Sequence, residues 1–163
     1  LKLKNRVENI SQEELQTLMS LGNAYRRNRQ IEKSLQVYEY IDKCLGEAYM
    51  GEPDVTAFQI SLWNCIARAY EKIKKNESAI ERIDKAISLA VQSDHGDVIP
   101  VLLSAKAFNV LKLINNGSYD ENRLEKVKRL SREAYYIAFA RGDYKSADSI
   151  LEYYKTHYNR KKL

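Results

Sequence analysis

The chain has few of the residues that interrupt helices, with two prolines and six glycines among its 163 residues. Proline and glycine most disfavour a helix interior, so their scarcity leaves few points at which a long helix must end. Hydrophobic residues make up 44% of the chain, and Leu, Ala, Glu, Lys and Arg are frequent. The composition therefore predicts an all-α protein.

Cysteine is scarce as well. Cys44 and Cys65 lie inside apolar-periodic segments, without the CxxC or Cys/His spacing of a metal site. This pattern predicts reduced thiols in a cytoplasmic protein. A domain of this length buries roughly 70% of its unfolded surface, so its core needs no disulfide.

Long hydrophobic runs are missing too. No segment approaches the ~20 apolar residues of a membrane span, and the charged start Leu1–Lys4 does not fit a signal peptide. We therefore expect a cytoplasmic location and no membrane partner. Because the first residue is not Met, we expect an excised domain or a chain without its leader, with residues 1–10 a linker or expression remnant and residues 11–163 a single helical domain.

Signals of catalysis are sparse. His95 lies between two aspartates in an expected loop and His157 lies near the basic end, each without a second histidine or cysteine at ligand spacing. A glycine-rich phosphate loop, Gly-x-Ser-x-Gly and His-Glu-x2-His are all absent from the sequence. We expect no enzyme activity, no cofactor and no metal, and turn to binding.

Residues 63–86 carry the clearest pattern that is present. Two sets recur at helical spacing: Trp63, Ile66, Ala67 and Tyr70, then Ala79, Ile83 and Ala86. Each set forms one stripe of a helix, and the small Ala67 and Ala79 allow the two helices to approach closely. One such hairpin cannot bury its apolar faces alone, so the pattern predicts stacked neighbours.

The same pattern occurs 45 residues earlier. Its members are Leu18, Leu21, Gly22 and Tyr25, then Ser34, Tyr38 and Ile41. Ser11 and Glu14 form a capping box ahead of it. Residues 98–115 are the most apolar segment, with a stripe of Val101, Leu102, Ala105, Phe108 and Leu111. With this segment included, the sequence predicts three hairpins and a capping helix. The expected helices span residues 12–28, 30–50, 55–75, 77–92, 98–115, 120–140 and 145–158, with stops at 51–54, 74–76 and 116–118.

These motifs resemble tetratricopeptide repeats, specifically over residues 15–92. The long second helix, the twelve tyrosines and the Gly-Asp-Tyr-x2-Ala turn at 142–147 are similar to the C-terminal repeat domains of Gram-positive bacterial regulators with a Cro/repressor-class helix-turn-helix. The resemblance implies a right-handed α-α superhelix that senses a short signalling peptide and mediates dimerisation. The helix-turn-helix itself is not in this chain, so nucleic-acid contact would belong to a missing N-terminal domain.

In tetratricopeptide arrays the first helix of each pair lines the concave groove. The residues opposite the packing stripe on the first, third and fifth expected helices are therefore the candidate binding residues. They are Asn23, Arg26, Arg27, Asn64, Arg68, Lys106 and Asn109, with Glu71 on the same side. An Asn amide both donates to and accepts from a peptide backbone, and an Arg can pair with its carboxylate. Gln16 and Met19 occupy the lysine slots of the chaperone-binding subtype, which argues against that subtype.

The net charge of +5 arises in residues 121–163, which contain 11 Lys/Arg against 6 Asp/Glu. This segment also contains the pairs Tyr135-Tyr136 and Tyr153-Tyr154. One explanation of this basic, tyrosine-rich segment is that it stacks nucleic-acid bases on a basic surface. The simpler explanation is that the charges lie on solvated helix faces and the tyrosines fill helix interfaces. Nine of these eleven basic residues are the candidates for contact with an acidic partner: Arg123, Lys126, Lys128, Arg129, Arg132, Lys155, Arg160, Lys161 and Lys162.

Three functions remain open. The leading hypothesis is a regulatory and interaction domain from a bacterial transcriptional regulator, which binds a peptide or protein segment in its groove and can form a homodimer. The first alternative is a free-standing scaffold for complex assembly. The second is a nucleic-acid-contacting module that uses the basic C-terminal helices, and its binding would weaken steeply with salt.

Overall fold

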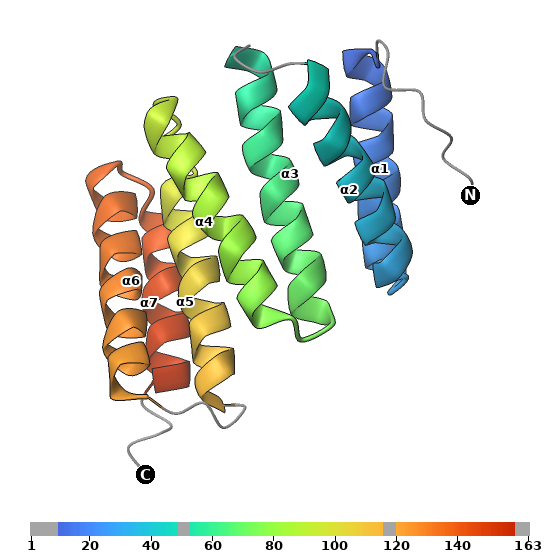
Figure 1. Ribbon diagram of the computed structural model, residues 1–163. Coiled ribbons are helices and arrows are strands. Elements are labelled where there is room, and N and C mark those ends of the chain that lie inside the picture. The colour runs from blue at the N-terminus through green and yellow to red at the C-terminus, as the bar shows by residue number, and fades with distance from the viewer. Residues whose placement is uncertain (1–9, 49–52, 116–119, 159–163) are drawn as a thin grey trace.

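The computed structural model describes residues 10–48, 53–115 and 120–158. Over these residues the chain forms seven α-helices and no strand, so the all-α prediction is confirmed. Each helix packs against the next, as in a helical repeat, with α1 and α7 at the back of the view in Figure 1. The helices are α1 (Gln12–Arg27), α2 (Ile31–Ala48), α3 (Pro53–Lys72), α4 (Asn76–Gln92), α5 (Ile99–Asn115), α6 (Glu121–Ala140) and α7 (Tyr144–Tyr158).

Side-chain caps define the starts of α1 and α6. The capping box is confirmed: Ser11 Oγ accepts from Glu14 N at 3.2 Å, and Glu14 Oε2 accepts from Ser11 N at 2.9 Å. The hydrogen bonds that the Ser11 N–H and hydroxyl donate to the Glu14 carboxylate lower the pKa of Glu14. Asp120 caps α6 through the backbone N–H of Asn122 at 2.9 Å. The expected stop at 116–118 and residues 49–50 of the second expected helix lie outside the described residues.

Four helices end in the same left-handed turn. The residues with positive φ are Arg29, Lys74, Asp94 and Gly142, three of which are not glycine. In each case the next residue donates its N–H five positions back, as from Lys75 to the carbonyl of Tyr70 at 3.0 Å. This turn explains why α3 ends at Lys72 and not at the expected Lys75.

The predicted stripes form most of the core. Ile66, Ala67, Ala79, Ile83 and Ala86 are all buried. In the first hairpin the buried members are Gly22, Ser34, Tyr38 and Ile41, and Ser34 Oγ donates to the carbonyl of Gly22 at 2.9 Å. Small residues thus lie where the two helices meet in each of the first two hairpins.

Two stripe residues are exposed. Leu21 is 36% exposed, because α1 is the first described helix and has no earlier helix over that edge. Val101 is 45% exposed, because it borders a hollow between α3 and α5. Periodicity identified the apolar side of these helices. Neighbouring helices cover only part of that side, so Leu21 and Val101 stay exposed.

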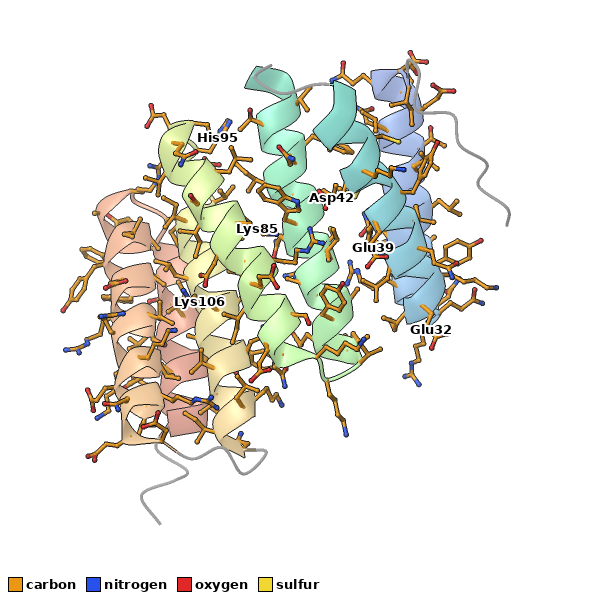
Figure 2. The ribbon with its side chains drawn as sticks, in the orientation of Figure 1. Glu32, Glu39, Asp42, Lys85, His95 and Lys106 are labelled. Atoms are coloured by element: carbon orange, nitrogen blue, oxygen red, sulfur yellow. The ribbon has the colours of Figure 1, made fainter. Side chains whose placement is uncertain are left out.

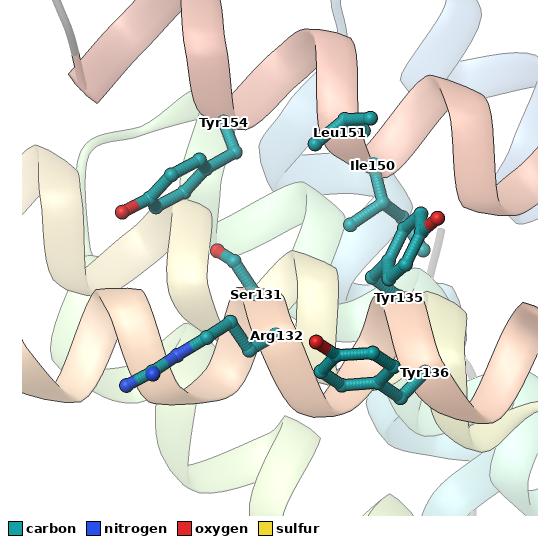
Figure 3. Close-up of a pocket in the computed structure, with 7 residues that line it drawn as sticks. All are labelled: Ser131, Arg132, Tyr135, Tyr136, Ile150, Leu151 and Tyr154. Carbon is teal, nitrogen blue, oxygen red and sulfur yellow. The ribbon is translucent and has the colours of Figure 1, made fainter.

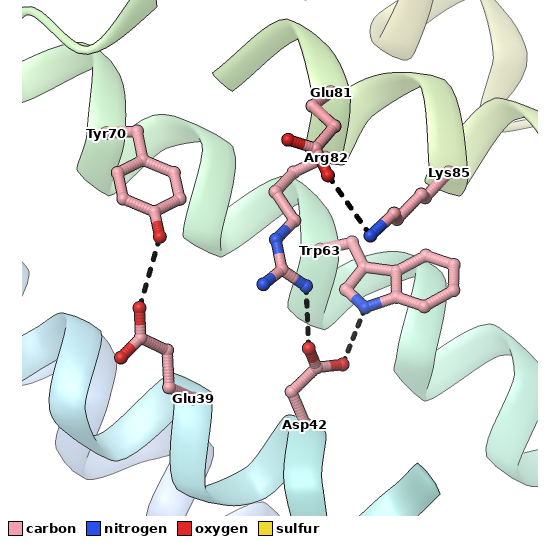
Figure 4. A network of polar contacts seen from close by, with 7 residues as sticks. All are labelled: Glu39, Asp42, Trp63, Tyr70, Glu81, Arg82 and Lys85. Atoms are coloured by element: carbon pink, nitrogen blue, oxygen red, sulfur yellow. Dashed lines mark hydrogen bonds and ion pairs between the residues drawn. The ribbon is translucent and has the colours of Figure 1, made fainter. Parts of the chain in front are cut away.

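A polar network joins α2, α3 and α4 (Figure 4). Asp42 on α2 accepts from Trp63 Nε1 at 2.6 Å and pairs with Arg82 on α4 at 2.6 Å. Tyr70 donates its hydroxyl hydrogen to Glu39 at 3.1 Å. The first two hairpins are therefore connected by hydrogen bonds and an ion pair in addition to apolar contacts.

Candidate functional site: the face formed by the odd-numbered helices

The helices α1, α3, α5 and α7 present side chains to a common surface, here called the odd-helix face. Each residue of this face contacts a residue of another odd-numbered helix, lines a hollow with one, or interacts electrostatically with one. The members are Asn23, Arg26, Asn64, Arg68, Glu71, Ser104, Phe108, Lys112 and Tyr153. Four of the expected binding residues, Asn23, Arg26, Asn64 and Arg68, belong to it.

Asn23 anchors the α1 end of this face. Its Oδ1 accepts from the Tyr38 hydroxyl at 2.8 Å and from Arg26 at 3.3 Å, and the Cys65 thiol lies 3.7 Å away. The carbonyl oxygen of Asn23 is therefore used within the fold. Burial raises the pKa of the Cys65 thiol, although the positive charges of Arg26 and Arg68 oppose the shift.

A hollow of about 200 Å³ lies between α3 and α5. Ser61 and Asn64 line it from α3, and Val101 and Leu102 line it from α5. Asn64 Oδ1 is enclosed and has no hydrogen-bond partner within the described residues. A buried carbonyl oxygen without a partner costs roughly 1–3 kcal/mol, so this oxygen favours a ligand that can donate to it.

A second hollow, of about 250 Å³, lies between α5 and α7 and reaches α6. The rings of Phe108 and Tyr153 form one wall, with their centroids 5.6 Å apart, and Lys112 Nζ lies 5.0 Å from the Phe108 centroid. Ser104 and Ser149 add hydroxyl groups. Ser104 Oγ is enclosed, and nothing in the described parts of the chain hydrogen-bonds to it.

Glu71 interacts electrostatically with residues of α3, α5 and α7. Burial raises the pKa of its carboxyl group, although Lys72, Arg68 and Lys112 oppose that shift. Burial and the negative charge of Glu71 together raise the pKa of the Tyr153 hydroxyl. The end of α3 therefore lies close enough to α7 for the Glu71 carboxylate to disfavour ionisation of the Tyr153 hydroxyl, so the odd-helix face extends from α3 to α7.

Positive charge dominates the remainder of this face. Arg68 is exposed, and Arg26 is half-buried with its Nε enclosed and lacking a partner among the described residues. Arg27, another expected binding residue, is exposed at the end of α1. The acids on this face are Glu71 and Asp97, which lines the hollow between α3 and α5. Arg26, Arg27, Arg68 and Lys112 outnumber them, so the surface favours a ligand that carries negative charge.

Two expected binding residues lie elsewhere. Lys106 forms an ion pair with Asp84 on α4, and Figure 2 shows it on the side of the array where Glu39, Asp42 and Lys85 lie. Asn109 is 1% exposed and donates to the carbonyl of Ala105 at 2.9 Å. The helical period gives the side of a helix on which a residue lies, but not the neighbouring helix that covers it. The positions expected for these two residues were therefore wrong. Neither residue enters the proposed site.

Four residues of the odd-helix face were not predicted from the sequence as binding residues: Ser104, Phe108, Lys112 and Tyr153. Phe108 was assigned to the apolar stripe, and Tyr153 to the basic C-terminal segment. Their common surface depends on α7 lying beside α5, and the sequence has no strong motif that places α7 there. The helical spacing of Ser104, Phe108 and Lys112 was the available signal.

The basic residues of the last two helices are partly neutralised. Lys128 pairs with Glu125, Arg129 with Glu133 at 3.7 Å, and Lys155 with Glu152 at 3.6 Å. These are pairs along one helix on its surface, which leaves less charge for a phosphate backbone. Arg160, Lys161 and Lys162 lie outside the described residues.

Within the described residues, no group of three or more His, Cys, Asp or Glu side chains could hold a metal ion. His95 is half-buried in the loop after α4. None of the described helices has the length and apolar character of a membrane span.

The fold and the odd-helix face define an all-α array of packed helices with a candidate binding surface. No protein-family model and no curated protein matches the chain. Among solved structures it is similar to one described as "DHF79 filament", at 18% identity, covering 89% of this chain and 82% of that chain, with a TM-score of 0.37. A likeness this weak defines neither a fold family nor a function, so the resemblance to tetratricopeptide regulators stays a prediction.

Proposed function

We propose that the chain is a tetratricopeptide-like right-handed superhelix that serves as a regulatory interaction domain and binds an extended peptide or protein segment along its odd-helix face. One observation carries the proposal. Three enclosed polar atoms without a partner among the described residues lie on three successive odd-numbered helices: Arg26 Nε, Asn64 Oδ1 and Ser104 Oγ. A peptide backbone supplies donors and acceptors at regular intervals, which suits such a row.

The two hollows on this face provide room for side chains of the bound segment. They lie one after the other, between α3 and α5 and then between α5 and α7. The positive charges of Arg26, Arg68 and Lys112 surround this path and favour a segment with a free carboxylate or acidic side chains. The proposed ligand is therefore a short, extended peptide with apolar side chains and a negative charge.

A soluble library of heptapeptides with free C-termini tests this function. Peptides retained by the protein are identified by mass spectrometry, and their affinity is measured by calorimetry. Asn64→Ala/Arg68→Ala removes two contacts, one of them charge-assisted, so we expect a loss of about tenfold or more. The control Glu81→Ala/Lys85→Ala removes an exposed pair on α4 and should bind normally.

Equal affinity for the wild type and Asn64→Ala/Arg68→Ala would exclude the odd-helix face as the binding surface. Retention of no peptide at all would exclude peptide binding as the function and favour a scaffold that contacts folded partners. Binding by a regulator further predicts that the natural gene encodes a DNA-binding domain before Leu1, which gene sequencing tests independently.

A further inference from the structure

A third hollow lies between α6 and α7, away from the row of enclosed atoms (Figure 3). Its volume is about 250 Å³. We call it the tyrosine hollow, and its lining consists of Ser131, Arg132, Tyr135, Tyr136, Ile150, Leu151 and Tyr154. Ser131 and Ile150 also line the hollow between α5 and α7, so they form the wall between the two spaces.

The walls of the tyrosine hollow are apolar and aromatic. Three tyrosine rings and two aliphatic side chains line it, and Tyr136 is 65% exposed. The rings of Tyr135 and Tyr136 lie edge to face with their centroids 5.4 Å apart. Aromatic walls favour a planar or branched apolar group, which can pack against ring faces and edges.

Arg132 gives the hollow a positive charge. Its neighbours Lys128 and Arg129 pair with Glu125 and Glu133, whereas no acid of the described chain pairs with Arg132. Ser131 adds a hydroxyl group, which Figure 3 shows between the two helices on the side of Tyr154. A guanidinium group and a hydroxyl group beside apolar walls match a carboxylate attached to an apolar body.

The size of the hollow selects a small molecule. Pockets for drug-sized ligands typically measure ≈ 300–1,000 Å³, and this one is smaller. We propose that the tyrosine hollow binds a small organic anion with an aromatic or branched apolar body. The tyrosine hollow shares the wall of Ser131 and Ile150 with the hollow between α5 and α7, but it contains none of the three enclosed atoms, so this proposal does not rest on the peptide path.

Amide chemical shifts of the isotope-labelled full chain test the proposal. The probes are phenylacetate, indole-3-acetate and 4-methylpentanoate, with 2-phenylethanol as the uncharged counterpart of phenylacetate. We expect saturable shifts at residues 131–136 and 150–154 with at least one acid. Because a charge-assisted hydrogen bond is lost, Arg132→Gln should weaken that binding about tenfold or more. The alcohol should bind at least about tenfold more weakly than phenylacetate.

Arg129→Gln is the matched control, because it removes a cation of the same helix that is paired with Glu133. Its affinity should equal that of the wild type, and circular dichroism checks that both variants are folded. The proposal is overturned if none of the three acids gives saturable shifts at these amides, or if the two variants bind alike. Shifts by a twelve-nucleotide oligothymidylate alone would reassign the surface to nucleic-acid binding.

Discussion

Gly22 sits where α1 and α2 come closest, and the space beside it is already filled. A Cβ atom at this position would lie 2.4 Å from Tyr38 Cε1 and 2.8 Å from Tyr38 Cδ1. The Tyr38 ring is fully buried, and its hydroxyl is held by Asn23. The ring therefore has little freedom to move aside. Gly46 on α2 offers the opposite case, with no atom within 4 Å of an added Cβ.

Gly22→Ala is expected to lower the free energy of unfolding by about 1–3 kcal/mol, because overpacking displaces the buried ring. Gly46→Ala should raise it by roughly 0.5–1 kcal/mol, because alanine favours the helix and meets nothing. Urea denaturation measures both. Equal effects of the two substitutions would contradict the close approach of α1 and α2.

Glu71 makes stability depend on pH in a defined direction. Because burial raises its pKa in the folded state, the folded protein retains a proton that the unfolded chain has released in the interval between the two pKa values. The free energy of unfolding of the wild type should therefore rise as the pH falls through the folded pKa. Glu71→Gln lacks this titration. It should be more stable than the wild type at pH 7, and the difference should shrink toward acid pH.

Urea denaturation of both proteins over a pH series measures this difference. A variant that is less stable than the wild type at neutral pH would show that attraction by Arg68 and Lys112 exceeds the cost of burying the carboxylate. Glu71 would then be a stabilising residue of the odd-helix face.

Periodicity correctly predicted which side chains are buried where the two helices of a hairpin approach closely. Gly22, Ala67 and Ala79 were correctly assigned to contacts between paired helices. Lys106 and Asn109 were not located correctly, because a spacing of 100° per residue gives the side of a helix and not the identity of the neighbour. The partner of Lys106 lies on α4, 22 positions earlier in the chain.

The helices could be predicted closely, but the left-handed residues in three of their terminal turns could not. Capping residues and the apolar period gave seven helices with ends within three residues of those observed. The left-handed residues Arg29, Lys74 and Asp94 carry no sequence signal, since glycine or asparagine normally marks such a position. Tertiary packing of each hairpin imposes the turn, and the side chain tolerates the strained backbone.

Lys74→Gly should therefore stabilise the protein by about 0.5–1 kcal/mol, because glycine adopts positive φ without steric strain. Gln36→Gly, at an exposed position inside α2, should destabilise it by about 1 kcal/mol, since glycine disfavours a helix interior. Thermal unfolding compares the pair. Loss of stability in both variants would show that Lys74 is not strained.

The arrangement of the complete array could be predicted only in outline. The repeat of one motif at an offset of 45 residues indicated stacked hairpins, and the observed packing of consecutive helices agrees with that. The interaction of Glu71 on α3 with Tyr153 on α7 was not foreseen. It joins residues 82 positions apart, and no local pattern encodes how far an array turns between its hairpins.

The location of a bound peptide decides whether the odd-helix face is the working surface of this protein. The measurement is the change in amide hydrogen exchange when the tightest peptide from the library is added to the full chain. We predict protection in α1, α3, α5 and α7, centred on Arg26, Asn64, Ser104 and Tyr153, with little change in α2 and α4. Protection confined to α2 and α4, or to the α6–α7 surface, would contradict the proposed binding mode.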